Sequence, residues 1–424
     1  MRKTQTILLS VFVSLIFLVS GALGQTPKYI ILFIGDGMGA NHRILAEKVS
    51  EVKGLGKLEM NHLPVRGEAK TNCLDQEGRA TETTDSAAAA TALACGVKTG
   101  RGMLGMKQNH TPGDNFTDDA QKAGWKVGII TTDWLNGATP GGFYAHTKSR
   151  HMYDEILKQA AKSDVDFFAG RGFKGKDVDK ILREGGYNVV KGKIDSANPP
   201  KMPCANLEMG SMADTLQAAL AMLENPKGFF IMLESSHIDG HSHGNFFAGA
   251  INETISMNDA VRVALDFQKK HPNDTLIITT ADHECGGLTI VDKNLDPRGL
   301  LKVKNPRDVE KIIVNDVVAF KPSDEELITN IKDAIELEDI SQKDQKILID
   351  LYRKKKIKGD DGLVREVVRL MNEQAGITWT SGGHTSDPVP TTAVGVGSEA
   401  FKGKYENTHI ADAIRGFIQQ SVKK

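Results

Sequence analysis

Apolar runs separated by polar clusters are the main pattern along this 424-residue chain. Near-continuous apolar runs with helical segments between them are typical of a parallel sheet that helices cover on both faces. We therefore predict an α/β fold, a three-layer α/β/α sandwich around a large, mostly parallel central sheet. The runs with the length of a buried strand, each bounded by Gly, Asp or Thr, are 29–34, 125–131, 229–233, 275–279 and 392–396.

A second pattern, rich in charge, runs from about residue 296 to residue 374. Ser323 and Glu326 have the spacing of a helix capping box, and helical periods follow over 328–335, 347–352 and 364–371. This segment is predicted to be a helical insertion or cap that packs on the sheet. Residues 25–424 then form one domain that contains the insertion.

The first 24 residues have the pattern of a signal peptide. Arg2 and Lys3 give a positive start, residues 7–19 are apolar apart from two serines, and Ala22-Leu23-Gly24 offers small residues for cleavage. The apolar run is short for a membrane span, and an uncleaved anchor is the alternative. We expect an exported protein, periplasmic or secreted, that begins near Gln25 and keeps no stable membrane anchor.

Composition excludes one class of partner. Lys and Arg total 53, Asp and Glu total 54, and aromatic residues make up only 6% of the chain. Without a positive surplus or many stacking side chains, nucleic acid is not an expected partner. An exported chain with four cysteines can form two disulfides, and three pairings stay open for Cys73, Cys95, Cys204 and Cys285. Cys285 could instead be a plain buried thiol.

Acidic residues follow several predicted strands. Asp36 lies between two glycines after the first strand, Glu234 follows the third, and Asp282-His283 comes soon after the fourth. In open α/β sheets, ligands bind beyond the carboxyl ends of the strands, so these side chains are candidates for one site. The alternative for Asp36 is a turn residue that satisfies its own backbone. The alternative for His283 is a surface position at the end of a strand.

The segment 234–243 is dense in metal-binding side chains. Asp239 and His243 are four residues apart, so one helical turn would place both on one face, as metal ligands require. Glu234 offers a hard oxygen that suits magnesium. A polar loop is the alternative, and the neighbouring histidines 237 and 241 need not be ligands. Further along the chain, His384 follows two glycines. It is a candidate ligand only because these other metal-binding residues are present.

Ser86 precedes an alanine run, the strongest helix former available. Its hydroxyl is therefore expected in the first turn of a helix, where unpaired N–H groups favour an anion. Considered alone, this segment favours a helix cap for Ser86, with a nucleophile facing phosphate as the alternative. Arg150 could clamp two phosphoryl oxygens, although by itself it would be taken for a surface charge.

In order and spacing these residues resemble the alkaline phosphatase family, with matching positions from Asp36 to His384. The resemblance implies hydrolysis of phosphate monoesters with two zinc ions and one magnesium ion. It makes Ser86 the nucleophile, Arg150 the phosphate-binding residue and Asp85 the residue that orients Arg150. It implies that the first zinc is held by Asp239, His243 and His384, the second by Asp36, Asp282 and His283, and the magnesium by Asp36, Thr139 and Glu234.

Two positions depart from familiar family members, and both tune the outer shell of the site. Many bacterial relatives have Asp, and animal ones His, where this chain has Gly137, and many have Lys or His at the position of Gly240. The departures bear on magnesium affinity, phosphate release and pH optimum. The alternatives kept open are a sister phosphodiesterase on the same scaffold and a non-catalytic periplasmic phosphate- or metal-binding protein. A homodimer is a further expectation from the family.

Overall fold

A computed structural model describes residues 26–292, 294–304, 306–359 and 362–423. The predicted signal peptide, residues 1–24, lies outside the described residues. Within the described part, no helix combines the length and the apolar character needed to cross a bilayer. The four cysteines are all buried thiols without a disulfide, so none of the three pairings that the sequence left open is present.

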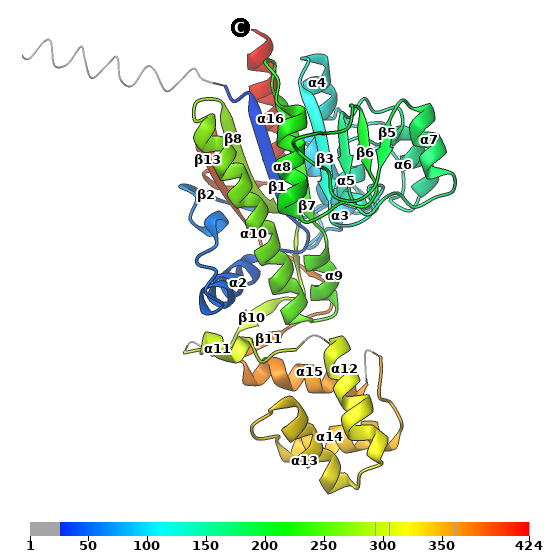
Figure 1. Cartoon of the computed structure of the whole chain (residues 1–424), viewed down its shortest axis with the longest axis vertical. Coiled ribbons are helices and arrows are strands. Elements are labelled where there is room, and N and C mark those ends of the chain that lie inside the picture. Colours follow the sequence, from blue (N-terminus) through cyan, green and yellow to red (C-terminus); the bar gives the residue numbers. More distant parts are fainter. Residues whose placement is uncertain (1–25, 293, 305, 360–361, 424) are drawn as a thin grey trace, which may run out of the picture.

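A ten-stranded sheet forms the centre of the molecule, in the order β14-β2-β13-β8-β1-β7-β3-β4-β6-β5 (Figure 1). β13 alone runs antiparallel to its neighbours, so the predicted α/β class with a large, mostly parallel sheet is confirmed. The sheet strands are β1 (Tyr29–Gly35), β2 (Val65–Lys70), β3 (Lys126–Thr131), β4 (Phe167–Ala169), β5 (Asn188–Val190), β6 (Cys204–Asn206), β7 (Phe229–Ser235), β8 (Thr275–Ala281), β13 (Val389–Gly395) and β14 (Gly403–Glu406). Two short ribbons pair β10 (Leu288–Ile290) with β11 (Ile377–Trp379) and β9 (Glu284–Cys285) with β12 (His384–Thr385).

The alternation of side chains along each strand divides the core into two halves. In β1, Ile31 and Phe33 enter one apolar cluster, whereas Ile30 and Leu32 enter the other. Helices α2, α8 and α10 contribute to the first cluster, and α3, α4, α6 and α16 to the second. The sheet is therefore the middle of three layers, which explains why β1 is apolar at every position except its last.

Helices cover both faces of the sheet, and a further group of helices lies at the lower end of the molecule in Figure 1. The helices are α2 (Ala40–Val52), α3 (Ser86–Cys95), α4 (Phe116–Lys122), α5 (Ala138–Gly141), α6 (Tyr153–Ala160), α7 (Val178–Glu184), α8 (Met212–Leu223), α9 (His237–His243), α10 (Phe247–Lys270), α11 (Pro297–Leu300), α12 (Pro306–Ile312), α13 (Asp324–Ile335), α14 (Gln342–Arg353), α15 (Leu363–Gln374) and α16 (Thr408–Val422). Shorter helical turns occupy Glu59–Asn61, Ile313–Val317, Val318–Phe320 and Ser398–Phe401.

The lower helical group, α11 to α15, leaves and rejoins the rest of the chain through the β10–β11 ribbon. The predicted capping box begins α13, where Ser323 accepts from the amide of Glu326 and the Glu326 carboxylate accepts from the amide of Ser323. Apolar side chains of this group, among them Ile331 and Val367, continue the first core cluster. We call residues 297–374 the helical insertion.

The C-terminal helix α16 packs on α3, the helix that begins with Ser86. Ile410 and Ile414 share the second apolar cluster with Leu93. Arg415 donates from Nη2 to the carbonyl oxygen of Cys95 at 3.1 Å. The end of the chain therefore supports the helix on which the candidate nucleophile stands.

Candidate active site

Three adjacent parallel strands bring the predicted site residues together. β1 lies between β7 and β8, and in the register of the sheet Gly35 pairs with Ser235 on one side and Ala281 on the other. Asp36 and Asp282 therefore follow their strands at the same carboxyl end of the sheet, and Glu234 lies near the end of β7 beside them. Gly37 turns the chain away with a φ of +72°, and a Cβ there would lie 2.9 Å from Asp239. Only glycine fits this close approach.

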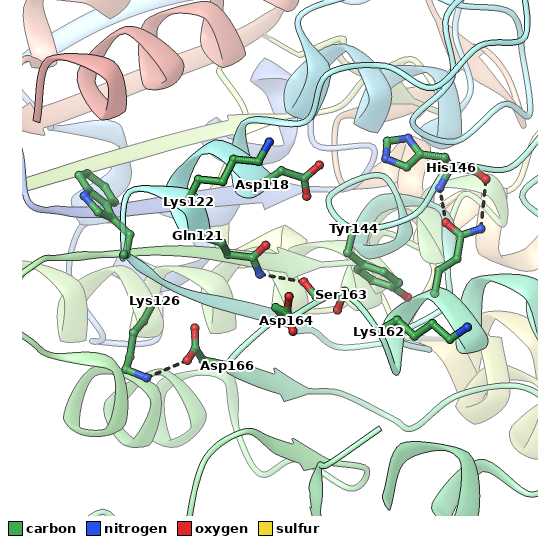
Figure 2. Close-up of a pocket in the computed structure, with 13 residues that line it drawn as sticks. Asp118, Gln121, Lys122, Lys126, Tyr144, His146, Lys162, Ser163, Asp164 and Asp166 are labelled. Atoms are coloured by element: carbon green, nitrogen blue, oxygen red, sulfur yellow. Dashed lines mark hydrogen bonds and ion pairs between the residues drawn. The ribbon is translucent and has the colours of Figure 1, made fainter. Parts of the chain in front are cut away.

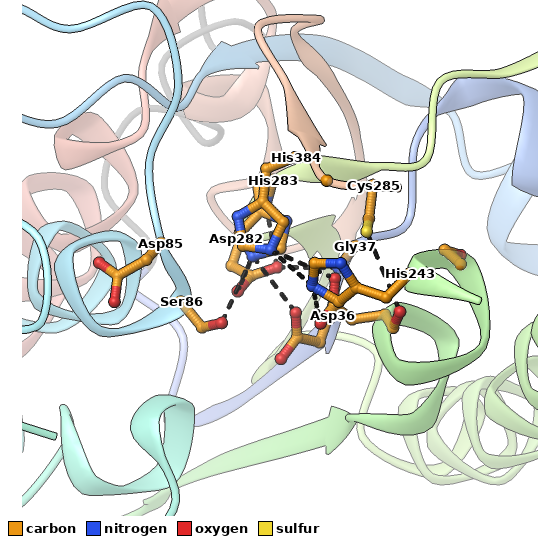
Figure 3. Close-up of polar contacts among 12 residues, drawn as sticks. Asp36, Gly37, Asp85, Ser86, His243, Asp282, His283, Cys285 and His384 are labelled. Carbon is orange, nitrogen blue, oxygen red and sulfur yellow. Dashed lines mark hydrogen bonds and ion pairs between the residues drawn. The ribbon is translucent and has the colours of Figure 1, made fainter. Parts of the chain in front are cut away.

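Asp36, Asp282 and His283 form a buried cluster (Figure 3). His283 Nε2 lies 3.4 Å from Asp36 Oδ1 and 3.3 Å from Asp282 Oδ2. Asp36 is 6% exposed and the other two are fully buried. One imidazole nitrogen and carboxylate oxygens at such spacing are a donor set that suits zinc.

Asp239, His243 and His384 form a second cluster beside the first. His243 Nε2 lies 3.2 Å from Asp239 Oδ2 and 3.2 Å from His384 Nε2. On each imidazole the other nitrogen contacts a backbone carbonyl: His243 Nδ1 lies 2.7 Å from Gly382 O, and His384 Nδ1 lies 2.8 Å from Thr84 O. Because Nδ1 donates to a carbonyl, Nε2 of the neutral ring is left as the free donor to a metal.

Buried negative charge at this site calls for cations. Burial raises the pKa of Asp36 well above its usual range, and the charges of Asp282, Asp239 and Glu234 raise it further. Burial likewise raises the pKa of Asp282 and of Glu234, each to about 7. Asp36 Oδ1 and Asp282 Oδ2 have no hydrogen-bond partner among the described residues. Divalent cations stabilise buried carboxylates that lie close together and have oxygens without donors, so these residues fit the implied metals.

The three imidazoles in the two clusters differ in the direction in which their pKa is shifted. Burial lowers the pKa of His283 to about 4 and also lowers the pKa of His384, so both are neutral, as metal ligands must be. The hydrogen bond with Asp239 raises the pKa of His243 to about 9. Burial would raise the pKa of Asp239, but the His243 hydrogen bond and the nearby imidazoles outweigh it, and the net shift is downward.

The residues expected to hold magnesium also lie together. Glu234 is 2% exposed and accepts a short hydrogen bond from the Thr131 hydroxyl. Thr139, in the first turn of α5, is buried and lowers the pKa of Glu234, yet its hydroxyl makes no hydrogen bond of normal geometry. With Asp36 nearby, these hydroxyl and carboxylate oxygens are the hard ligands that magnesium prefers.

Ser86 is the first residue of α3, and Asp85 is the residue that caps the helix. Asp85 Oδ1 accepts from the amides of Ala88 and Gly102, each at 3.1 Å. The expectation, from this segment alone, that Ser86 itself is the cap is therefore wrong, because Asp85 already satisfies the third-position amide. Ser86 is 3% exposed, and its hydroxyl lies 3.4 Å from His283 Nε2.

Arg150 completes the site from the loop after α5. Its Nη1 lies 3.2 Å from Asp85 Oδ2, so one carboxylate both caps α3 and holds the guanidinium. Arg150 and Asp85 are half-buried side chains, 32% and 16% exposed, which leaves part of the guanidinium free for a ligand. Burial and the neighbouring carboxylates raise the pKa of Asp36, and the charge of Arg150 offsets a small part of that rise.

Sequence reasoning missed Cys285 as a member of the site. The thiol is fully buried, and its sulfur lies within 4.8 Å of ligand atoms of Asp239, His243 and His384. In the sequence, the available signal was that Cys285 lies only two residues after His283. In the structure, the β9–β12 pairing places Cys285 opposite His384. His237 and His241, by contrast, belong to neither cluster.

A separate hollow lies away from the residues of the two clusters. This hollow, of about 730 Å³, is lined by Trp125, Tyr144, His146 and several lysines and aspartates (Figure 2). His146 donates its amide to Gln159 Oε1 at 2.8 Å there. Its lining shares no residue with the two clusters, so this hollow is separate from the candidate site.

The two glycines that depart from the family pattern lie in different surroundings. A Cβ on Gly137 would lie 2.8 Å from the carbonyl oxygen of Trp134, whereas a Cβ on Gly240 would meet nothing within 4 Å. The turn from Trp134 to Gly137, which leads into Thr139, therefore has no room for the acid or histidine of the relatives. At Gly240, in α9, a long side chain has space.

Matched alanine variants test this difference. We expect Gly137→Ala to lower the free energy of unfolding by about 1–3 kcal/mol through the clash with the Trp134 carbonyl. We expect Gly240→Ala to leave it unchanged or raise it by up to about 1 kcal/mol, because alanine favours the helix. Urea unfolding of both variants beside the parent measures this. A Gly137→Ala protein as stable as the parent would contradict it.

Comparison with known proteins gives a consistent family match. A family model described as alkaline phosphatase matches residues 27–201 and 200–420. Alkaline phosphatase 4 of Bacillus subtilis is 29% identical over 423 residues, covering 91% of this chain and 88% of the relative. The alkaline phosphatase of Escherichia coli K12 is 29% identical over 361 residues, covering 68% of this chain and 76% of the relative.

Solved structures agree. A cold-active alkaline phosphatase from a psychrophilic Shewanella superposes with a TM-score of 0.76 at 25% identity, covering 92% of this chain and 99% of that one. The alkaline phosphatase of the Antarctic bacterium TAB5 gives a TM-score of 0.66 at 26% identity, with 93% and 98% covered. A variant of that enzyme in which glutamate replaces a histidine has been solved with magnesium bound in its M3 site.

Proposed function

Because this chain belongs to the alkaline phosphatase family and is a phosphatase, we propose that it hydrolyses phosphate monoesters through a phosphoseryl intermediate on Ser86. The observation that carries the proposal is the position of the Ser86 hydroxyl. It is buried at the start of α3, 3.4 Å from His283 Nε2, and Arg150 is held nearby by Asp85. A nucleophile beside cation ligands and an anion clamp has the composition of a phosphoryl-transfer site.

Two zinc ions and one magnesium ion are proposed as cofactors. One zinc would be held by Asp239, His243 and His384, the other by Asp36, Asp282 and His283, and magnesium by Asp36, Thr139 and Glu234. When bound, these cations supply Lewis acidity and positive charge opposite the attacking and leaving oxygens. Magnesium in a variant of the related Antarctic enzyme, in which glutamate replaces a histidine, supports the third position.

The protein groups then have distinct tasks. Arg150 binds two non-bridging phosphoryl oxygens, with its guanidinium oriented by Asp85, and the positive end of α3 adds to the attraction. Ser86 Oγ attacks phosphorus, the ester P–O bond breaks, and the alcohol leaves with a proton. Water then attacks the phosphoserine, the bond from phosphorus to Oγ breaks, and phosphate and the Ser86 hydroxyl are restored. Each step displaces one oxygen in line.

A phosphodiesterase on the same scaffold is the nearer alternative. A diester keeps two non-bridging oxygens instead of three, and its second ester group occupies the space beside them, so a guanidinium that binds two non-bridging oxygens favours monoesters. The non-catalytic binding protein is set aside, because the chain is a phosphatase.

The choice between esters can be measured. We expect kcat/KM for p-nitrophenyl phosphate to exceed that for its bis ester, and Arg150→Ala to reduce the monoester value by about 10²-fold or more while affecting the diester much less. Lys148→Ala, which removes an exposed charge two residues away, is the matched control and should match the parent. A diester rate equal to the monoester rate, or equal losses in Arg150→Ala, would favour the phosphodiesterase.

Export and formation of a homodimer stay predictions for this chain. The residues that would direct export lie outside the described part. Small-molecule phosphate monoesters are the proposed substrates, and the helical insertion is proposed as a cap on the catalytic domain.

A further inference from the structure

The helical insertion contacts the chain next to a proposed zinc ligand through one arginine. Arg365, in the first turn of α15, donates from Nη1 to the Gly244 carbonyl at 2.9 Å and from Nη2 to Asn245 Oδ1 at 3.1 Å. These two residues directly follow His243, the last residue of α9. Two turns further along α15, Asn372 Nδ2 donates to the Asn245 carbonyl at 3.4 Å. The insertion thus holds the corner that leaves α9.

Asn245 also contacts the segment that carries His384. Its Nδ2 donates to the Ser381 carbonyl at 2.8 Å, across 136 positions of sequence. The next carbonyl, that of Gly382, contacts His243 Nδ1 at 2.7 Å. Asn245 therefore ties together the two segments that present His243 and His384.

The backbone at this corner depends on such partners. Asn245 has a φ of +56°, in the left-handed region that Asn tolerates better than most residues. The carbonyls at the end of a helix lack partners within the helix, and Arg365 satisfies that of Gly244. A planar guanidinium holds two acceptors in one fixed geometry, which a lysine cannot do.

These hydrogen bonds border a hollow in the protein. This hollow, of about 340 Å³, lies between α15 and the α9 corner and is lined among others by Gly244, Asn245, Arg365, Arg369 and Trp379. The hydrogen bonds of Arg365 cross beside this space and connect the insertion to the α9 corner. Arg369 faces the same hollow but pairs with Asp344, Glu366 and Glu373, all within the insertion.

We propose that Arg365 is a positioning residue for the zinc cluster of Asp239, His243 and His384. It fixes the corner after His243 and, through Asn245, the segment before His384, and so sets the zinc affinity of that cluster. This inference rests on the proposed function, because it takes these three residues as zinc ligands. The insertion is then part of the metal site's support as well as a cap.

Zinc affinity of the metal-free protein tests the proposal. Arg365→Gln is expected to weaken the binding of one zinc per chain by about 10–100-fold, measured by competition with a chromophoric chelator. Arg369→Gln is the matched control: it removes an arginine from the same helix and the same hollow, and should bind zinc like the parent. Arg365→Lys keeps one donor and should fall between them. Thermal unfolding of the metal-free variants identifies any loss that comes from misfolding.

A second variant keeps the test independent of the insertion's own stability. Asn245→Gly preserves the left-handed backbone and removes the side chain that links Arg365 to Ser381. We expect a loss of zinc affinity similar to that of Arg365→Gln, and little further loss in the double variant, because both act through one connection. Equal zinc affinity in Arg365→Gln and Arg369→Gln, with the parent binding zinc, would overturn this inference alone. A parent that binds no zinc would overturn the proposed function itself.

Discussion

Replacing Ser86 with alanine is expected to lower kcat/KM for a phosphate monoester by about 10³-fold or more. The change removes only the Oγ that attacks phosphorus, at a position where the side chain is buried and not used as a helix cap. Arg150 and the proposed metal ligands stay in place, so the zinc content and the affinity for phosphate should change little. Steady-state kinetics and elemental analysis of the same preparation measure both.

Two further observations make this result specific. Ser163→Ala, a serine in the separate hollow of Figure 2, should keep the parent rate. A monoester with a chiral phosphorus should be hydrolysed with retention, because two in-line displacements each invert the centre. Inversion, or a Ser86→Ala enzyme with undiminished kcat/KM, would mean that water attacks the substrate directly.

Removal of divalent metals is expected to have the second large effect. Dialysis against a chelator should abolish monoesterase activity, and zinc with magnesium should restore it. The metal-free protein should also unfold at a lower temperature, because its buried carboxylates lose their counter-ions. At free zinc about 1,000 times the dissociation constant, binding adds about 4 kcal/mol to the free energy of unfolding. Activity that survives complete removal of metal would refute the proposed cofactors.

A pair of histidine variants assigns the effect to particular ligands. His243→Ala should lose one zinc per chain and most of its activity, because His243 is a proposed ligand in the Asp239 cluster. His237→Ala removes a histidine from the same helix, α9, that belongs to neither cluster, and should keep the full metal content. Metal analysis of the two purified proteins, without any assay, decides this. Equal metal content in both would contradict the assignment.

The sheet could be predicted because its central strands are buried on both faces. Every position of β1, β7 and β8 is buried, and Asp36, Glu234 and Asp282 lie at or just after their carboxyl ends, so the strands and the site at their ends could be predicted. Strands β4, β5 and β6 each span three residues, too short for a periodic pattern. β2 carries Arg66 and Glu68, with only two buried positions, because it lies near the edge of the sheet.

The site was predictable where a residue's chemistry is local. Asp239 and His243, four apart, lie on one turn of α9 as expected. Contacts between distant segments were not predictable, because they depend on where loops meet. Thr84 orients His384 through a carbonyl, which carries no side-chain signal. Arg365, in a charge-rich helix, has the same appearance in sequence as Arg369, although only Arg365 bonds to the corner after His243.

The packing of α16 on α3 gives the order in which the site can be completed. In chain order, α16 follows every other described element and is synthesised after them. Until then, α3 lacks Ile410 and Ile414 against its apolar side and the Arg415 bond to the Cys95 carbonyl. A nascent chain therefore exposes apolar surface at the base of the Ser86 helix. Removal of α16 is therefore expected to lower activity even though every proposed metal ligand is retained.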